Sequence, residues 1–432
     1  MSKAWWVWGA MIGAALVMAV GAFGEPGSSP TGLLVRENVL LRMMPDIYPD
    51  TIVVSADGKH FAYAAEREKS SAVVVDGQES GPYDFMWQGR ISLSAEGGRV
   101  AYGATRRGQN FVVSNGIEGR PYERVGRVAL SADGKHLAYT AVREGMMCLV
   151  VDGVEGEAWE DLGMPVYAPA GDRLVYTAKR GGQWYVVEGG KTGAGYDEIG
   201  RTRFFSPEGG HIAFPVRFGR KWAVVMDGVK GEEYDRVEAI VFSDDGQHMA
   251  YVAQDARQWK VVVDGVARVV GSRLRGAVFA PGSAKLGYIE PIDDKPVLVI
   301  DGVPGKVYAG LLSFELSRGG EHIALVVAGE DQSLSDTLAT RGESTGTRSV
   351  ILDGRESPRY DAIAQVRFSP DGEHLVYAAR QGPWWKVFWD GEEVGRYEDI
   401  LNRGQVVFNQ AGEACFAARR GAEILWVEVE AQ

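Results

Sequence analysis

Short apolar runs of about five residues, separated by polar turns, recur along almost the whole chain. Representative runs are Ile240–Phe242, His248–Ala253 and Trp259–Val263. They are too short for helices and lack a 3.6-residue period, so they predict β-strands. Many end in Asp-Gly, a pair that tolerates the positive φ of a two-residue hairpin turn. The pattern therefore predicts antiparallel hairpins in units of four strands, A to D.

This unit recurs ten times. One landmark is a serine position in segments such as FSPDG, which falls at Ser55, Ser94, Ser131, Ala168, Ser206, Ser243, Ala280, Ser317, Ser369 and Asn409. A second is the turn that begins at Asp76, Asn115, Asp152, Gly189, Asp227, Asp264, Asp301, Asp353 and Asp390, with glycine next each time. Repeated four-stranded units of this length are typical of propeller blades. We predict an all-β fold, a β-propeller of ten four-stranded repeats over residues 45–432.

The two ends of the repeat array complement each other. The last third strand, Glu423–Glu430, stops where its turn should begin, and Tyr48–Thr51 has the pattern of a fourth strand without a third strand before it. We expect this N-terminal strand to complete the last blade and close the ring, which removes exposed edges. A single ring needs one closure and is favoured; two five-bladed rings in tandem are the alternative.

The segment FSPDGEHLVYAARQG, Phe368–Gly382, resembles the WD-like propeller repeat of TolB-type proteins. The resemblance extends over nearly all of the chain after its N-terminal segment. It departs from TolB in having ten repeats rather than six and no separate N-terminal α/β domain. Proteins with such propellers include periplasmic interaction proteins and serine peptidases gated by the propeller. The resemblance therefore implies the fold and leaves the activity open.

The N-terminal segment predicts export. Lys3 precedes an uncharged apolar stretch, Ala4–Gly24, with small residues at Ala22 and Gly24 for signal-peptidase cleavage. We expect residues 1–24 to be a signal peptide and 25–44 a linker and lead-in segment. The protein would then be periplasmic or secreted. An uncleaved membrane anchor is the alternative, because the stretch is long enough to span a bilayer. Cys148 and Cys415 lie far apart in the repeat pattern and should be free, buried thiols.

Composition narrows the function. The chain has 57 glycines in 432 residues and a net charge of −12, which indicates a turn-rich protein without a broad nucleic-acid surface. No phosphate loop, zinc signature or dinucleotide motif occurs, so we expect no cofactor and no metal site. The match to G-x-S-x-G at Gly342–Gly346 lies in a polar insertion instead of between a strand and a helix, and we interpret it as chance.

The six histidines could be mistaken for a metal or acid–base site because they recur at one position of the repeat. All six follow the serine position by five residues: His60, His136, His211, His248, His322 and His374. A metal or acid–base cluster would need them to converge, whereas equivalent positions in blades are spread around a ring. We predict that each histidine hydrogen-bonds its own turn. The aspartates of the Asp-Gly turns are likewise expected to stabilise those turns.

One face of the ring carries a row of arginines. Because strand direction alternates, the A–B and C–D turns share one face, and the B–C and D–A connections share the other. The second face, the arginine face, collects Arg67, Arg106, Arg143, Arg180, Arg217, Arg380 and Arg420, together with Arg341 and Trp384. Acids that follow a tyrosine position approach the same face. Local ion pairing and a ligand-binding ring are both compatible with this pattern.

Other aromatic and charged positions give structural expectations. Trp184, Trp222, Trp259 and Trp385 share one position and should pack between blades, although a carbohydrate platform is the alternative. Trp384 and Trp389 depart from it and should be exposed. Glu315 and Arg367 occupy one strand A position in consecutive repeats, so we predict that they pair.

These observations favour an exported, non-enzymatic propeller that binds a protein or an envelope ligand through the arginine face. We expect a monomer that contacts a membrane only if the N-terminal segment stays uncleaved. No catalytic residue is assigned. The alternative is a propeller enzyme, a carbohydrate hydrolase or lyase, with two carboxylates roughly 5–10 Å apart over the central channel. Strand A contributes only Glu315 to such a pair.

The first testable prediction concerns the insertion at residues 330–347. It lies between strands B and C of the eighth repeat, and its polar composition fits either disorder or recognition. Deleting residues 331–345 should restore the usual repeat length and leave the thermal midpoint nearly unchanged. Unfolding would make the loop structural. Unchanged affinity for the partner would make the loop passive.

Overall fold

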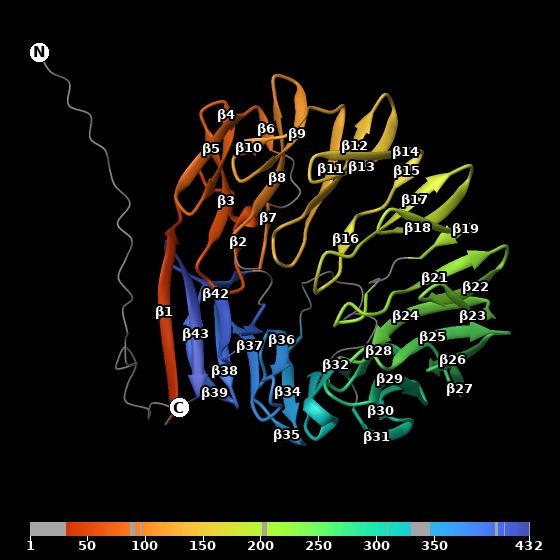
Figure 1. Cartoon of the computed structure of the whole chain (residues 1–432). Helices are drawn as coiled ribbons and strands as arrows, with labels where there is room; N and C mark the ends of the chain where they lie inside the picture. Colours follow the sequence, from red (N-terminus) through yellow and green to blue (C-terminus); the bar gives the residue numbers. More distant parts are fainter. Residues whose placement is uncertain are drawn as a thin grey trace, which may run out of the picture.

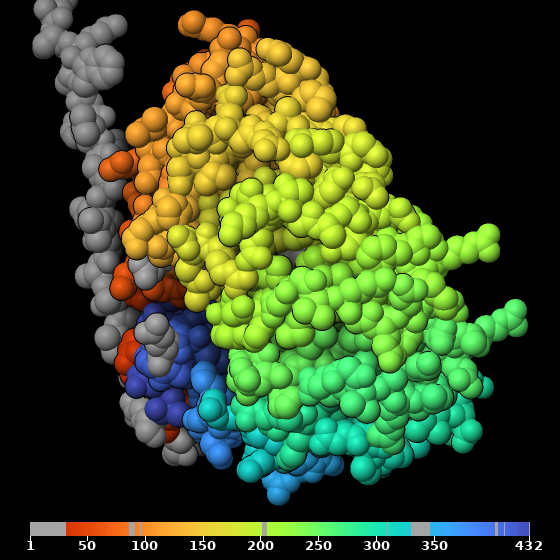
Figure 2. Space-filling model, turned by 45° about the vertical axis from the view of Figure 1, so that its right-hand side comes forward, coloured from red at the N-terminus to blue at the C-terminus, as the bar shows by residue number. Residues whose placement is uncertain are grey.

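The chain forms ten blades that follow one another around a ring (Figure 1). This computed structural model describes residues 32–86, 91–95, 97–200, 205–308, 310–329, 346–401, 405–409 and 411–431. In the space-filling view, the colours pass from orange through green to teal along one continuous sweep of blades (Figure 2). The predicted all-β propeller with a single ring is therefore confirmed.

The first five blades span the N-terminal half of the ring. Blade 1 comprises β2 (Val53–Val54), β3 (Phe61–Arg67), β4 (Ser70–Val75) and β5 (Gln78–Tyr83). Blade 2 comprises β6 (Phe85–Met86), β7 (Ser92–Leu93), β8 (Val100–Arg106), β9 (Gln109–Ser114) and β10 (Ile117–Glu118). Blade 3 comprises β11 (Arg124–Leu130), β12 (Leu137–Arg143), β13 (Met146–Val151) and β14 (Val154–Trp159). Blade 4 comprises β15 (Asp161–Leu162), β16 (Val166–Tyr167), β17 (Leu174–Arg180), β18 (Gln183–Glu188) and β19 (Lys191–Tyr196). Blade 5 comprises β20 (Glu198–Ile199), β21 (Ala213–Phe218), β22 (Lys221–Met226) and β23 (Val229–Tyr234).

The remaining five blades complete the ring. Blade 6 comprises β24 (Arg236–Phe242), β25 (Met249–Asp255), β26 (Gln258–Val263) and β27 (Val266–Val270). Blade 7 comprises β28 (Arg275–Phe279), β29 (Leu286–Ile292), β30 (Lys295–Ile300) and β31 (Val303–Val307). Blade 8 comprises β32 (Leu311–Leu316), β33 (Ile323–Ala328), β34 (Arg348–Leu352) and β35 (Arg355–Glu356). Blade 9 comprises β36 (Ala362–Phe368), β37 (Leu375–Gln381), β38 (Trp384–Trp389) and β39 (Glu392–Tyr397). Blade 10 comprises β40 (Asp399–Ile400), β41 (Val407–Phe408), β42 (Ala414–Arg420), β43 (Glu423–Ala431) and β1 (Leu33–Arg42).

Two short 3-10 helices are described, η1 (Pro49–Thr51) and η2 (Arg318–Gly320). None of the helices among the described residues has the length and apolar character required to cross a bilayer. The apolar stretch at residues 4–24 lies outside the described part of the chain.

Two-residue turns set the register of the outer strands. Asp76 and Gly77 have φ values of 48° and 80°, the left-handed conformation at both central positions. The other eight turns of this kind repeat these signs. Asp and Gly tolerate that conformation better than β-branched residues do, which explains the recurrence of the pair.

The core lies between the blades rather than in one centre. Ala62 and Val73 of blade 1 pack with Val100 and Tyr102 of blade 2 in one buried cluster. Similar clusters bridge the other blades, and Cys148 and Cys415 are buried, free thiols within this packing. A blade thus buries both sheet faces only when it has a neighbour on each side.

The N-terminal strand supplies the last neighbour. β1 pairs antiparallel with β43, from Leu33 opposite Ala431 to Arg42 opposite Glu423 (Figure 1). Closure by an N-terminal strand is confirmed, but the segment expected to form it was wrong. Residues 49–51 form η1, and the closing strand lies upstream, within the segment expected to be a linker.

Glu37 fixes β1 to blades 9 and 10. Its carboxylate accepts hydrogen bonds from both terminal nitrogens of Arg420, at 2.6 and 2.8 Å, and from the Tyr397 hydroxyl at 2.9 Å. Tyr397 is fully buried, and burial, followed by the Glu37 charge, raises its pKa well above the ordinary value. Arg36 adds ion pairs to Glu413 and Glu430.

The second prediction tests the contribution of Glu37 to ring closure. Glu37→Ala leaves the Tyr397 hydroxyl and the Arg420 guanidinium without their acceptor, so it should lower the free energy of unfolding by about 1–3 kcal/mol. Arg42→Ala is the control, because it removes a solvent-exposed pair with Glu423 and should cost about 0–1 kcal/mol. Urea unfolding followed by tryptophan fluorescence measures both. Equal losses would show that Glu37 has no special part in closure.

Candidate functional site

The six histidines all make the same contact. Each imidazole Nδ1 lies 2.6–2.8 Å from Oδ2 of the aspartate that begins the C–D turn of the same blade. A carboxylate only accepts, so Nδ1 carries the proton. The second oxygen of each aspartate accepts the backbone N–H that follows the histidine, as between Asp152 and Leu137. The predicted hydrogen bond to the histidine's own turn is made by its backbone N–H, which donates to the serine of the A–B turn, whereas the ring contacts the C–D turn.

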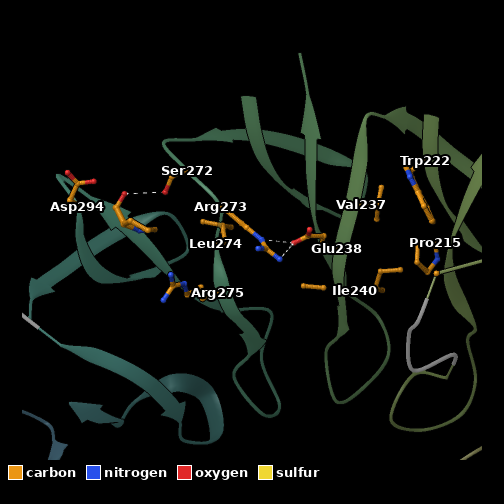
Figure 3. A pocket seen from close by; sticks show the side chains of 13 residues that line it. Pro215, Trp222, Val237, Glu238, Ile240, Ser272, Arg273, Leu274, Arg275 and Asp294 are labelled. Atoms are coloured by element: carbon orange, nitrogen blue, oxygen red, sulfur yellow. Dashed lines mark hydrogen bonds and ion pairs between the residues drawn. The ribbon is translucent and has the colours of Figure 1, made fainter. Parts of the chain in front are cut away.

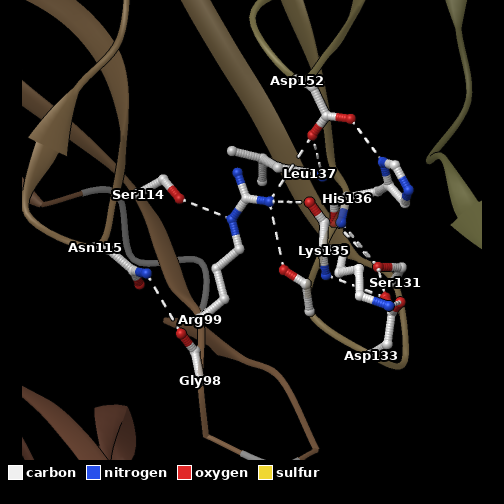
Figure 4. Close-up of polar contacts among 11 residues, drawn as sticks. Gly98, Arg99, Ser114, Asn115, Ser131, Asp133, Lys135, His136, Leu137 and Asp152 are labelled. Carbon is white, nitrogen blue, oxygen red and sulfur yellow. Dashed lines mark hydrogen bonds and ion pairs between the residues drawn. The ribbon is translucent and has the colours of Figure 1, made fainter.

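A Ser–His–Asp set thus recurs, but it lacks the geometry of a catalytic triad. In blade 3, Ser131 Oγ donates to Asp133 at 2.7 Å and accepts the backbone N–H of His136 at 2.9 Å (Figure 4). Its partner is the backbone of the histidine and not its ring. A nucleophile would need the imidazole within hydrogen-bond reach. These serines organise the A–B turn.

Blade 2 replaces the histidine by an arginine that reaches the next blade. Arg99 donates to Ser114 Oγ at 3.0 Å and to the Lys135 carbonyl of blade 3 (Figure 4). Arg173 of blade 4 contacts the Gly209 and Gly210 carbonyls of blade 5 in the same way. The face that carries these turns is therefore built for cohesion between blades.

The arginine face is also largely paired. Six of its seven row members contact carboxylates: Arg67 with Asp46 and Glu79, Arg106 with Glu118, Arg143 with Glu155, Arg180 with Glu157, Arg217 with Glu198, and Arg420 with Glu37. Arg380 has no carboxylate partner among the described residues. Arg341 lies outside the described residues. Local ion pairing thus accounts for most of the row, and its role in binding stays a prediction.

These arginines also connect blades through aromatic rings. The guanidinium of Arg106 in blade 2 lies 5.0 Å from the Tyr83 ring of blade 1, and Arg180 lies 4.0 Å from Trp159 of the preceding blade. Arg420 stands 5.0 Å from Tyr397. Such cation–π contacts contribute about 0.5–2 kcal/mol each, depending on desolvation.

Local ion pairing on this face would place the arginines against the acids that follow the tyrosine position, but these acids have a different partner. Their carboxylates accept backbone N–H groups of the B–C turn, as Asp235 does from Ala256 at 2.9 Å and Asp361 from Gly382 at 2.7 Å. The full set is Asp84, Glu123, Glu160, Asp197, Asp235, Asp361 and Glu398. They therefore close turns and leave most of the arginines to other acids.

This system of contacts is interrupted in one sector of the ring. Gln254, Pro291 and Ala328 stand at the arginine position of blades 6, 7 and 8. The acid position is Gly271 before blade 7 and Ala309 before blade 8, and Val270 replaces the tyrosine. Blades 6–8 therefore lack the arginine of this face, and blades 7 and 8 also lack the acid, whereas blade 6 keeps Asp235.

A cleft opens in the same sector. It has a volume of 980 Å³ and runs from blade 5 across blade 6 to blade 7. Pro215 and Trp222 form one end, and Asp294 and Ser272 lie at the other (Figure 3). Gly200 permits this wall, because a Cβ there would lie 2.8 Å from Pro215 Cγ. The cleft is thus apolar at one end and charged at the other.

The middle of the cleft carries a clamped carboxylate. Glu238 forms an ion pair with Arg236 at 2.6 Å and accepts a hydrogen bond from Arg273 at 2.8 Å, and its side chain is only 20% exposed. The next residue, Ala239, has φ of 51° at a bulge in β24, a conformation that costs a non-glycine residue about 1–2 kcal/mol. Arg275 is exposed and has no carboxylate partner among the described residues. The cleft therefore presents one free guanidinium beside a neutralised acid.

The described acids of the cleft do not form the pair that a glycosidase requires. Glu238 lies in the middle of the cleft and Asp294 at one end, and two arginines engage Glu238 (Figure 3). Within the described ranges, no cluster of metal-ligating side chains occurs.

The predicted pair of Glu315 and Arg367 is confirmed, with 2.8 Å between Arg367 Nη1 and Glu315 Oε1. Burial raises the pKa of Glu315, and Arg367 opposes that shift. The pair lies in a separate 270 Å³ cavity between blades 8 and 9.

The tryptophans divide as follows. Trp222, Trp259 and Trp385 pack against cores between blades, as expected. Trp384 is 42% exposed, also as expected. The expectation for Trp389 was wrong, because it is 4% exposed and packs against Phe408.

Comparison with known proteins gives fold-level likeness. No protein-family model matches the chain, and no curated protein matches it. Similar solved structures include TolB from Acinetobacter baumannii, at 15% identity over 71% of this chain and 80% of that one, with a TM-score of 0.30. They also include the Dos1 propeller, at 10% identity over 91% and 93%, with a TM-score of 0.35. The propeller domain of the Trilobed protease from Pyrococcus furiosus matches at 11% identity over 71% and 94%, with a TM-score of 0.36.

A TolB structure is among these matches, as the resemblance of the repeats led us to expect. The propeller assignment itself rests on the ten blades described above.

The third prediction concerns the histidine–aspartate contact. The hydrogen bond to Asp353 raises the pKa of His322 above its ordinary value. This contact therefore stabilises the fold fully below the ordinary histidine pKa, and the contribution is lost as pH rises through the raised value. Asp353→Asn should lower the pKa of His322 and reduce stability more at about pH 5 than at about pH 8.

Asparagine keeps the acceptor for the Ile323 N–H, as Asn115 does for Val100 in blade 2. The variant thus isolates the charge. NMR titration of the imidazole and urea midpoints at both pH values provide the test. An unchanged pKa of His322 would refute the assigned cause.

Proposed function

We propose that this protein is an exported, non-enzymatic binding module that holds a partner protein in the cleft over blades 5–7. The observation that carries the proposal is a coincidence of two features on the arginine face. The row arginine is missing in blades 6–8 and the acid is missing before blades 7 and 8, and the cleft opens in the same sector. Where one part of a repeated structure lacks contacts that the other repeats make, its surface can be used to bind a partner.

The lining of the cleft favours an extended segment of chain. Trp222, Pro215 and Pro291 provide apolar surface, and Arg275 provides a cation without a carboxylate partner among the described residues. A ligand with an apolar group at one end and a carboxylate farther along would match both. Arginine binds carboxylates through two parallel hydrogen bonds, which gives orientation as well as affinity.

Export is the second part of this proposal and rests on the apolar segment at residues 4–24. A periplasmic or secreted location follows from it, whether the segment is cleaved or remains as an anchor. The envelope is then the place to search for the partner.

The fourth prediction locates the partner. A photo-crosslinking phenylalanine analogue placed at Ser272, inside the cleft, should give a discrete adduct in the envelope of cells that produce the protein. The same analogue at Gln247 is the matched control, because this residue is exposed on the opposite face of blade 6. Arg275→Ala should reduce the adduct at Ser272 by about tenfold, the loss of one charge-assisted bond.

Adducts of equal yield at both positions, or no adduct at Ser272, would contradict the proposal. If the adduct persists in Arg275→Ala, the cleft remains the binding site, but the proposed carboxylate of the ligand is contradicted.

A further inference from the structure

One outer strand differs from the others in sequence. Eight outer strands that follow a two-residue turn place six residues from the turn to the tyrosine position and include a glycine or proline, namely Gly81, Gly119, Gly156, Gly193, Gly231, Gly305, Pro358 and Gly395. β27 has five residues, Val-Ala-Arg-Val-Val, and neither glycine nor proline. The stretch from the turn to the tyrosine position is therefore one residue shorter in β27 than in the other outer strands, and it has no irregular position.

The structure shows the consequence. Six of those eight outer strands meet their neighbour with a register shift, and the other two, β10 and β35, end after two residue pairs. β27 pairs with β26 over five consecutive positions without a shift. Bulges, glycine and proline are among the devices that protect sheet edges from further pairing. β27 lacks all three.

The free edge of β27 offers backbone hydrogen bonds. Val263 and Val266 flank the two-residue turn and form a hydrogen-bonded pair, so Ala267 and Val269 direct their N–H and C=O groups away from β26. β27 is the last strand of its sheet and lies at the outer rim of the ring (Figure 1). Val266 is 73% exposed and Val269 is 59% exposed, so apolar side chains accompany these groups.

Arg268 adds a fixed charge to this edge. Its guanidinium donates to the Asp301 and Gly302 carbonyls of blade 7 at 3.3 and 2.9 Å. Gly302 makes room for it, because a Cβ there would overlap the guanidinium. Carbonyls do not neutralise the charge, and no carboxylate partner occurs among the described residues. The cation is therefore held in place beside the open edge.

We propose that β27 is a strand-addition site for an extended segment of a partner protein. The segment would place apolar residues beside Ala267 and Val269 and an acidic residue beside Arg268. A second copy of this chain fits less well, because a two-fold pairing that uses both outward residues sets Arg268 against its twin, and like charges in that position repel. The surface is separate from the cleft and does not depend on the proposed function.

The test uses a fluorescent five-residue peptide with valine, glutamate and valine at its centre, and a matched peptide with lysine in place of glutamate. Ala267→Pro removes an outward N–H. It should preserve the fold, because Pro304 occupies the same position in blade 7. Lys230→Pro makes the same change in blade 5 and is the control. Anisotropy gives the affinity, and hydrogen exchange of the Ala267 and Val269 amides reports the site.

We expect the glutamate peptide to bind, to slow exchange at both amides, and to bind several-fold more tightly than the lysine peptide. Ala267→Pro should weaken binding by about tenfold or more, and Lys230→Pro should not. Arg268→Gln should abolish the preference for glutamate. Absence of binding, or equal effects of the two proline variants, would overturn the site. Equal affinity for both peptides would overturn the acidic partner. A dimer that Ala267→Pro dissociates would replace the partner by a second copy.

Discussion

The pairing of β1 with β43 is the constraint on which the rest of the structure depends. Every blade buries both faces against neighbours, so the first and last blades are stable only if the ring closes. Closure joins residues nearly 400 positions apart, which carries a large loop entropy before any contact forms. The long ladder, broken by one bulge, and the contacts of Glu37 with Tyr397 and Arg420 offset that entropy.

The blades of the ring repeat the same contacts, and the proposed binding surfaces lie where the blades differ from this pattern. On one face, histidine–aspartate contacts and arginines hold turns and neighbouring blades together. On the other, acids close the B–C turns and arginines cover the aromatic ring of the preceding blade. Blades 6–8 lack the arginine and blades 7 and 8 lack the acid, and there the cleft opens. In the same sector, β27 lacks the irregular residue that shields other edges. Three local departures from one repeat thus coincide on adjacent blades.

The sequence predicted several features of the ring well because comparing equivalent positions across the repeats reveals them. The blade count, the two-residue turns and the pair of Glu315 and Arg367 all followed from comparing equivalent positions. The closing strand was misplaced because Leu33–Arg42 carries neither an Asp-Gly turn nor a serine position. The histidine partner was missed because the aspartate lies sixteen residues away in five of the six cases and comes close only through sheet pairing. The cleft did have a sequence signal, because arginine is replaced by Gln254, Pro291 and Ala328 in this sector. That signal was missed because the search considered only the residues present at each position.

A disulfide trap across the closing ladder tests the central claim most directly. Arg42 and Glu423 are register partners at the end of β1 and β43, and in a single closed ring Arg42→Cys and Glu423→Cys should oxidise to an intramolecular bond. The oxidised protein should unfold at a higher temperature than the reduced one, because the bond constrains the unfolded chain. Two five-bladed rings would instead pair the N-terminal strand with the fifth blade. In that case the double variant would keep two free thiols at these positions, a result that would contradict the account.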